Sequence, residues 1–97
     1  MAREAAVVNA CTRLLKKRGA WHMNVHGAGT GRNGLPDLIA CHHGRFIAIE
    51  CKAPRGRIRP LQQHELDRIT SAGGHAIVAR TTTQLADILD AIDQEHQ

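Results

Sequence analysis

Aromatic side chains are scarce in this 97-residue sequence, which has one Trp, one Phe and no Tyr. This scarcity excludes an aromatic stacking platform as the main means of holding single-stranded nucleic acid. The cysteines are odd in number and lack the spacing of a disulfide framework, so we expect Cys11, Cys41 and Cys51 to be buried free thiols. No apolar run approaches ~18 residues, so no membrane-spanning helix is expected.

The remaining composition is that of one small globular domain, residues 1–97. Hydrophobic residues make up 42% and charged residues 23%, which argues against disorder. Lys and Arg outnumber Asp and Glu by 13 to 9, so the net charge of +4 makes nucleic acid the first partner to consider. The first residues lack the apolar core of a signal peptide, and we therefore expect a cytoplasmic protein.

The spacing of apolar residues predicts alternating helices and strands. Helices are expected over residues 3–18, 61–72 and from a cap at 81–83 to 91, with strands over 21–26, 37–41, 45–52 and 75–79. The turn His43-Gly44 would join the second and third strands as a hairpin, and the helix before the fourth strand permits parallel pairing. The sequence thus predicts an α/β fold, a small mixed β-sheet flanked by helices in the order αβββαβα.

Three charged residues interrupt the apolar strands. Asp37 opens the second strand, while Glu50 and Lys52 lie near the end of the third. Because residues two apart on a strand share a face, Glu50 and Lys52 should project together. Such charges carry a desolvation penalty unless they are paired or bind an ion. If the hairpin brings Asp37 near Glu50, a divalent cation would relieve the repulsion between the two carboxylates.

Oxygen ligands without thiolates or imidazoles favour Mg²⁺ or Mn²⁺. We expect Asp37, Glu50 and the backbone carbonyl of Cys51 to hold the ion. Lys52 would orient or deprotonate the attacking water, or stabilise negative charge on the phosphate in the transition state. The predicted reaction is hydrolysis of a phosphodiester bond.

The segments Gly34-Leu35-Pro36-Asp37-Leu38-Ile39 and Ile49-Glu50-Cys51-Lys52 resemble the PD-(D/E)xK nuclease motif. More narrowly, they resemble the virus-type replication-repair nuclease (VRR-NUC) domain in its stand-alone phage and bacterial form. The resemblance implies a restriction-endonuclease-like fold and a metal-dependent DNA endonuclease. It further implies a structure-selective, sequence-nonspecific enzyme acting on branched, flap or Holliday-junction DNA, and a homodimer.

Two further residues match elements of the same family. The family shows a Glu in its first helix, matched by Glu4, and a Gln opening the next helix, matched by Gln62. Their spacing to apolar residues places both on inward helix faces, whereas Gln63 points elsewhere. We expect Glu4 to bind the metal directly or through water, and the Gln62 amide to position the water or a phosphate.

Basic residues cluster around the motif. The expected phosphate contacts are Arg55, Arg57 and Arg59 in the loop after the third strand, together with Lys16, Lys17, Arg18 and Arg32. The segment Gly27–Gly34 resembles a phosphate-binding loop in composition, and we expect it to be mobile and to approach a DNA backbone. It lacks a Gly-Lys-Ser/Thr sequence and precedes no helix, so no nucleotide cofactor is expected.

Other chemistries find less support. His42 and His43 are adjacent at a turn and lack helix-type zinc spacing, and Cys51 has no evident base that would make it a nucleophile. One alternative function is a non-catalytic DNA-binding module, or a nuclease subunit that requires a partner. Another is an RNA nuclease or a tRNA-processing protein.

Overall fold

The computed structural model describes residues 3–26 and 31–97 of the chain. In this part the elements are α1 (Glu4–Lys17), β1 (Trp21–Asn24), β2 (Leu38–His42), β3 (Arg45–Cys51), α2 (Pro60–Ser71), β4 (His75–Ala79) and α3 (Thr83–His96). Their order and the α/β class are those predicted. None of these helices is long and apolar enough to cross a bilayer. Half of the glycine-rich segment, residues 27–30, falls outside the described residues.

The four strands form one mixed sheet in the order β1-β2-β3-β4. β2 pairs antiparallel with both β1 and β3, whereas β3 and β4 run parallel. The parallel pair is possible because α2 carries the chain back across the sheet. β2 and β3 form the predicted hairpin around His43 and Gly44, with Leu38 opposite Ile49.

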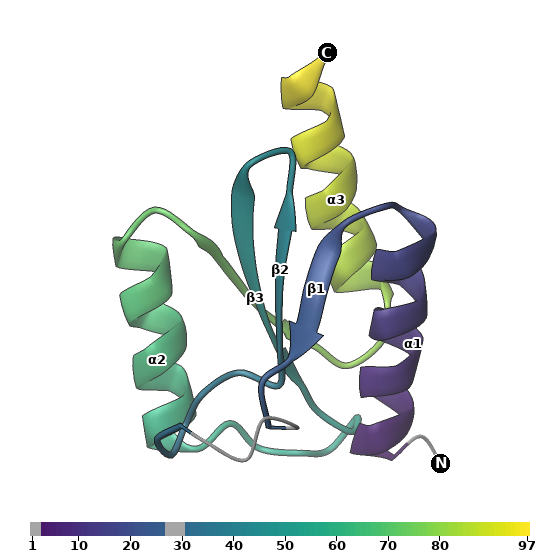
Figure 1. Ribbon diagram of the computed structural model, residues 1–97. Helices are drawn as coiled ribbons and strands as arrows, with labels where there is room; N and C mark the ends of the chain where they lie inside the picture. The colour runs from purple at the N-terminus through teal and green to yellow at the C-terminus, as the bar shows by residue number, and fades with distance from the viewer. Residues whose placement is uncertain (1–2, 27–30) are drawn as a thin grey trace.

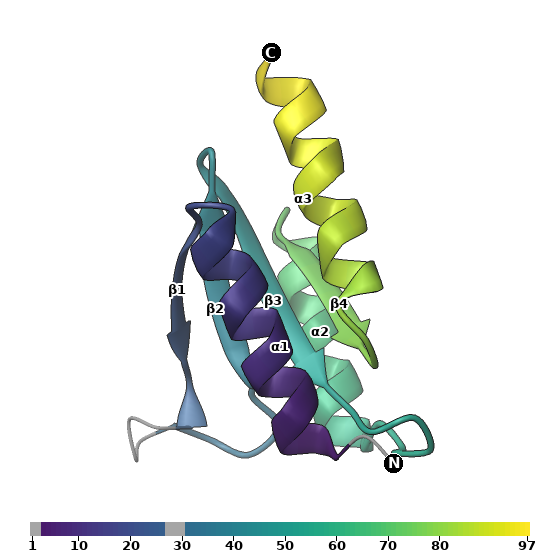
Figure 2. The same cartoon turned by 90° about the vertical axis from the view of Figure 1, so that its right-hand side faces the viewer.

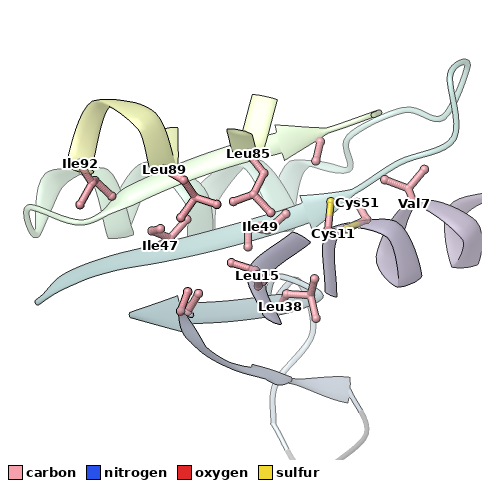
Figure 3. Close-up of a cluster of buried hydrophobic side chains, with 13 residues drawn as sticks. Val7, Cys11, Leu15, Leu38, Ile47, Ile49, Cys51, Leu85, Leu89 and Ile92 are labelled. Carbon is pink, nitrogen blue, oxygen red and sulfur yellow. The ribbon is translucent and has the colours of Figure 1, made fainter. Parts of the chain in front are cut away.

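The helices cover the sheet from both sides. Helices α1 and α3 lie against one face and α2 lies against the other (Figures 1 and 2). The main core lies under α1 and α3 (Figure 3), where the fully buried side chains include Leu15, Leu38, Ile47, Ile49 and Leu89. Alternate residues of β3 therefore point into this core, and those between them point toward α2.

Helix α3 is longer than predicted. It continues past residue 91 to His96 because Ile92 is buried in the core and Asp93 is held by Arg18 at the end of α1. The predicted threonine cap is present: the N-cap residue Thr82 makes no side-chain bond, but Thr81 Oγ1 accepts a hydrogen bond from the backbone N–H of Thr83 at 3.2 Å. The Gln84 side chain also accepts hydrogen bonds from the backbone N–H groups of residues 80 and 81.

The prediction that all three cysteines are buried is wrong for Cys41. Cys11 and Cys51 are buried, but Cys41 is exposed. It points away from the core formed by α1 and α3, and it pairs in register with Trp21 and Phe46, which are also exposed. Helix α2 contacts β3 and β4, so the β1–β2 half of this face carries uncovered apolar side chains.

The loop before β2 packs closely against the beginning of α2. Gly34 has a φ of +89°, and a Cβ atom there would lie 2.8 Å from the backbone carbonyl atoms of Leu61. Only glycine combines this left-handed conformation with so close an approach. The packing fixes the chain that leads into Asp37 relative to the first turn of α2.

Candidate active site

Asp37 lies at the point where three strands meet. Its backbone carbonyl accepts a hydrogen bond from the N–H of Val25, just after β1, at 2.9 Å. Its side-chain Oδ2 accepts one from the N–H of Cys51, the last residue of β3, at 2.8 Å. The carboxylate is therefore fixed at the end of β3, beside the position predicted for a second acidic residue.

Glu50 and Lys52 flank Cys51 and share the opposite face from its thiol. The Lys52 Nζ lies 3.6 Å from Glu50 Oε2, and their side chains are 8% and 1% exposed. The neighbouring Ile49 and Cys51 point into the core under α1 and α3. Glu50 and Lys52 thus project to the same side of the strand, as predicted.

Glu4 approaches the same place from the first turn of α1. Its Oε1 lies 3.9 Å from Lys52 Nζ. Glu4, Asp37 and Glu50 each have one carboxylate oxygen that lies within 4.8 Å of the corresponding oxygens of the other two. Three acidic residues distant in sequence therefore converge, and two of them, Glu4 and Glu50, lie within 4.0 Å of the Lys52 ammonium.

Gln62, in the first turn of α2, contacts Glu50. Its Oε1 accepts a hydrogen bond from the N–H of Arg59 at 2.9 Å, and its Nε2 donates one to Glu50 Oε2 at 3.2 Å. Because the carbonyl end is used at the helix terminus, the NH₂ end must face the carboxylate. Gln62 thus orients Glu50, whereas the sequence had suggested a contact to water or phosphate.

Burial sets the ionisation of Glu50. Loss of hydration, followed by repulsion from Asp37, raises the pKa of Glu50 from an ordinary 4.5 to about 7, and Lys52 opposes this increase. A carboxyl group in this environment exchanges its proton near neutral pH. It would also bind a cation in place of the proton, because the cation removes the same repulsion.

A divalent cation fits the residues that are present. Glu50 Oε1 is buried and accepts no hydrogen bond from any residue in the described part of the chain. A buried carboxylate oxygen without a partner is costly, and a bound ion is one explanation for it. The donor set of three carboxylates is hard and rich in oxygen, which suits Mg²⁺ or Mn²⁺.

Cys51 contributes its backbone to the site, while its thiol faces the core. A hydrogen bond with Cys11 and burial raise the pKa of the Cys51 thiol. The thiol is therefore protonated, and it lies beside Cys11 among the buried side chains of the core (Figure 3). This arrangement agrees with the expectation that Cys51 is not a nucleophile.

Sequence reasoning missed His26. Its Nε2 lies 3.3 Å from Asp37 Oδ1, and the ring is 54% exposed, so it stands between the carboxylate and solvent. The pairing of the first two strands explains why His26 reaches the site. Asn24 pairs with Leu38, so His26, which follows β1, lies alongside Asp37, which precedes β2.

A cavity of about 780 Å³ opens beside the carboxylates. His26 and Gln62, which each contact an acidic residue of the site, both line it. The other lining residues come from the loop before β2 and from the start of α2, and are Gly31, Arg32, Asn33, Gly34, Leu35, Arg59, Pro60 and Leu61.

The basic loop lies at the same end of the molecule. Arg55, Arg57 and Arg59 are exposed, and within residues 3–26 and 31–97 no ion pair involves them. Arg80, which the sequence analysis did not single out, holds this loop. Its Nη1 donates hydrogen bonds to the carbonyls of residues 53, 54 and 56 at 2.8, 3.2 and 2.8 Å.

The other predicted phosphate-binding residues are less available. Arg32 forms a two-point ion pair with Glu65 of α2, at 2.9 and 2.8 Å, so its charge is largely balanced. Arg18 is bound to Asp90 and Asp93. Lys16 and Lys17 form the end of α1, opposite to the end that carries Glu4 (Figure 1), and the structure does not bring them to the site.

Comparisons with known proteins bear on the fold and the family of this chain. A sequence model described as the VRR-NUC domain matches residues 3–83. A curated phage protein named "Putative nuclease p44", from Acyrthosiphon pisum secondary endosymbiont phage 1, is 38% identical over 64 residues, which are 65% of this chain and 68% of that protein. A solved structure described as a VRR_NUC domain superposes with a TM-score of 0.73 at 20% identity. This match covers 93% of this chain and 97% of the other, and it supports the α/β fold.

The raised pKa of Glu50 predicts a pH-dependent stability in the absence of metal. The stabilisation that comes from holding the proton is full below about pH 4.5 and is lost as the pH rises through about 7. Glu50→Gln should remove this loss and stabilise the metal-free protein at pH 8 by up to about 3 kcal/mol. Urea unfolding in EDTA between pH 5 and 8 measures the effect.

Glu95→Gln is the matched control, because this exposed α3 residue contacts only Arg45 among the described ion pairs and should keep the wild-type profile. An unchanged or lower stability of Glu50→Gln at pH 8 would show that the buried carboxylate is not strained.

Proposed function

The chain belongs to the VRR-NUC domain family, and from this premise we propose that it is a divalent-metal-dependent DNA endonuclease. It hydrolyses phosphodiester bonds in branched, flap or junction DNA without reading sequence. One observation carries the proposal. Carboxylates of Glu4, Asp37 and Glu50 converge beside the Lys52 ammonium, and a buried oxygen of Glu50 has no hydrogen-bond partner among the described residues.

Asp37, Glu50 and Glu4 would hold Mg²⁺ or Mn²⁺ through their carboxylates, together with the backbone carbonyl of Cys51. When bound, the ion supplies a Lewis acid that polarises a phosphate oxygen and lowers the pKa of a water molecule. Asp37 is kept in place by its hydrogen bond from Cys51 N–H. Glu50 is kept in place by the Gln62 amide, which makes Gln62 a positioning residue in this proposal.

Lys52 supplies the second chemical element. Its ammonium lies next to Glu50 and Glu4, so its charge is held at the site by two carboxylates. From there it orients the attacking water and stabilises the negative charge that grows on the phosphate oxygens. His26, on the solvent side of Asp37, is placed to meet the phosphate that enters from the cavity.

The DNA backbone would lie along the cavity and the basic loop. The loop carrying Arg55, Arg57 and Arg59 is exposed at this end and is braced by Arg80. Contacts from such side chains to phosphates position DNA without selecting a base sequence. Selectivity for branched DNA would follow from the shape of the duplex around the cavity.

We further propose that the protein acts as a homodimer. β1 is an edge strand, and the face shared with α2 carries Trp21 on β1 and Phe46 at the start of β3, which are 59% and 42% exposed. An unpaired strand edge beside an apolar surface favours association with a second copy. A twofold pair would present two sites to the two strands of a junction.

Two substitutions test the catalytic assignment. Asp37→Asn keeps an acceptor for the Cys51 N–H but removes the charge, and Lys52→Ala removes the ammonium. Each should lower cleavage by roughly a hundredfold or more while DNA binding in EDTA survives. The assay compares duplex, flap, fork and four-way junction DNA, and matched RNA, with Mg²⁺, Mn²⁺ or EDTA.

Glu95→Gln serves as the control and should cleave like the wild type. Retained activity in Asp37→Asn would refute the assigned site. DNA binding without cleavage by the wild-type protein under every metal condition would instead favour a binding module or a subunit that needs a partner. Preferential cleavage of RNA would reassign the substrate.

Arg57→Ala should reduce the dependence of DNA affinity on salt. Loss of one phosphate contact lowers the slope of log K against log salt by about 0.9. Fluorescence anisotropy over a salt series with a junction in EDTA measures this slope. Arg45→Ala, at the far end of β3 and paired with Glu95, is the matched control. Lys17→Ala in the same series tests the predicted contact at the end of α1, and an unchanged slope for Arg57→Ala would remove the basic loop from the interface.

Trp21→Lys should dissociate the homodimer, because it places a charge in the uncovered apolar surface. Sedimentation velocity over a range of concentrations measures the assembly. Leu61→Lys is a matched control, since Leu61 is equally exposed, at 57%, but lies at the start of α2. A wild-type protein that sediments as a monomer at all concentrations would refute this assembly.

A further inference from the structure

A second group of potential metal ligands lies at the turn end of the β2–β3 hairpin. We propose that His42, His43 and Asp93 form a binding site for Zn²⁺ or a similar transition-metal ion, which joins the hairpin turn to the C-terminal helix α3. Each of these residues has one possible ligand atom that lies within 4.8 Å of those of the other two. The proposal is independent of the function of the carboxylate site.

The distances suit a tetrahedral ion. The Nε2 atoms of His42 and His43 lie 2.7 and 3.3 Å from the same oxygen, Asp93 Oδ1. Ligand atoms about 2.0–2.1 Å from a tetrahedral Zn²⁺ are roughly 3.3 Å apart. The His43 separation has this value, and the His42 separation would have to lengthen by about 0.6 Å. Zn²⁺ would take the place of the hydrogen bond between His42 Nε2 and Asp93 Oδ1.

The carboxylate of Asp93 is already oriented for such a role. Arg18 Nη2 donates a hydrogen bond to Asp93 Oδ2 at 2.6 Å, and it also contacts Asp90 at 2.8 Å. This bond leaves Oδ1 facing the two imidazoles. Partners that fix the second atom of a ligand in this way are typical of metal sites. His42 is 6% exposed, so its ring is held by the surrounding side chains.

The conformation of the turn suits the residues that occupy it. His43 has a φ of +49° and Gly44 a φ of +77°, the two left-handed positions of a two-residue hairpin turn. His is among the non-glycine residues that adopt this conformation more often than most. The turn therefore accommodates the His43 side chain while its Nε2 lies 3.3 Å from Asp93 Oδ1.

His96 packs on the cluster as a stacking partner of His43 and is not one of its ligands. It lies one turn after Asp93 on α3, and its ring stacks on His43 with centroids 3.8 Å apart and planes inclined by 12°. A cavity of about 80 Å³ lies beside these rings, lined by His43, His96, Arg45, Glu95 and Ile92. This volume admits an ion or a water molecule and gives the cluster access to solvent.

The chemistry differs from that of the carboxylate site. Two imidazoles with one carboxylate favour Zn²⁺ and similar ions, whereas oxygen donors alone favour Mg²⁺ or Mn²⁺. The adjacent histidines lack helix-type zinc spacing in the sequence because their partners lie 51 and 53 residues away on α3. Only the packing of α3 against the hairpin assembles the set.

The cluster is spatially separate from the carboxylate site. Five residue steps of about 3.3 Å along β2 separate Asp37 from His42, which is roughly 16 Å. Asp93 and His96 also lie beyond residues 3–83, the part of the chain that matches the VRR-NUC domain. The ion would therefore act structurally and fasten α3 to the sheet.

Isothermal titration with Zn²⁺, in buffer containing excess Mg²⁺, tests the proposal. The wild-type chain should bind one Zn²⁺, and its melting temperature should rise by roughly 10 °C when free Zn²⁺ is about a hundred times the Kd. His43→Asn should bind at least about tenfold more weakly. Asn suits the left-handed turn, so the variant should fold as well as the wild type without metal.

Two control variants separate this site from other binding. Asp37→Asn removes a carboxylate of the other cluster and should bind Zn²⁺ at the hairpin like the wild type. His64→Ala removes an exposed histidine of α2 and should also leave binding unchanged. Equal Zn²⁺ binding and equal melting shifts in the wild type and His43→Asn would overturn the proposal, and the cluster would then be a hydrogen-bonded clamp only.

Discussion

The hydrogen bond from the Cys51 N–H to Asp37 Oδ2 is the contact on which the carboxylate site depends. It joins the residue before β2 to the last residue of β3, so it exists only when the hairpin has its native register. Because Glu50 and Lys52 flank Cys51 in the chain, the same bond brings the Asp37 carboxylate to their side of the sheet. The site is thus a consequence of strand pairing, and Glu4 and Gln62 are added by helices packed on that sheet.

The residues of this site could be predicted because their signals are local. Asp37, Glu50 and Lys52 are charges within apolar strands, and a period of two assigns Glu50 and Lys52 to one face. The hairpin turn at His43-Gly44 was equally readable. Glu4 and Gln62 came from family resemblance together with helical spacing, and the structure brings both to the carboxylates.

The features that could not be predicted depend on contacts between segments far apart in the sequence, which no local pattern encodes. The exposure of Cys41 follows from how far α2 reaches across the sheet, and Arg32 is balanced by Glu65 only because the loop folds over that helix. Arg80 reaches across to brace the basic loop. The sequence pattern predicts too early an end for α3, because Arg18 and His42, which contact Asp93 in its last turns, lie far away in the chain.

The buried carboxylate of Glu50 also explains why the sheet has so little freedom of register. A shift of β3 by one residue would exchange its two faces. Glu50 would then enter the apolar core under α1 and α3, and Ile49 would face the acidic site. Each exchange is unfavourable, since Glu50 and Lys52 would both be buried among apolar side chains, away from Gln62 and Glu4, and a large apolar side chain would meet carboxylates. The apolar residues of β3 therefore hold Glu50 beside Asp37, in a position that these two carboxylates, which repel each other, would not maintain by themselves.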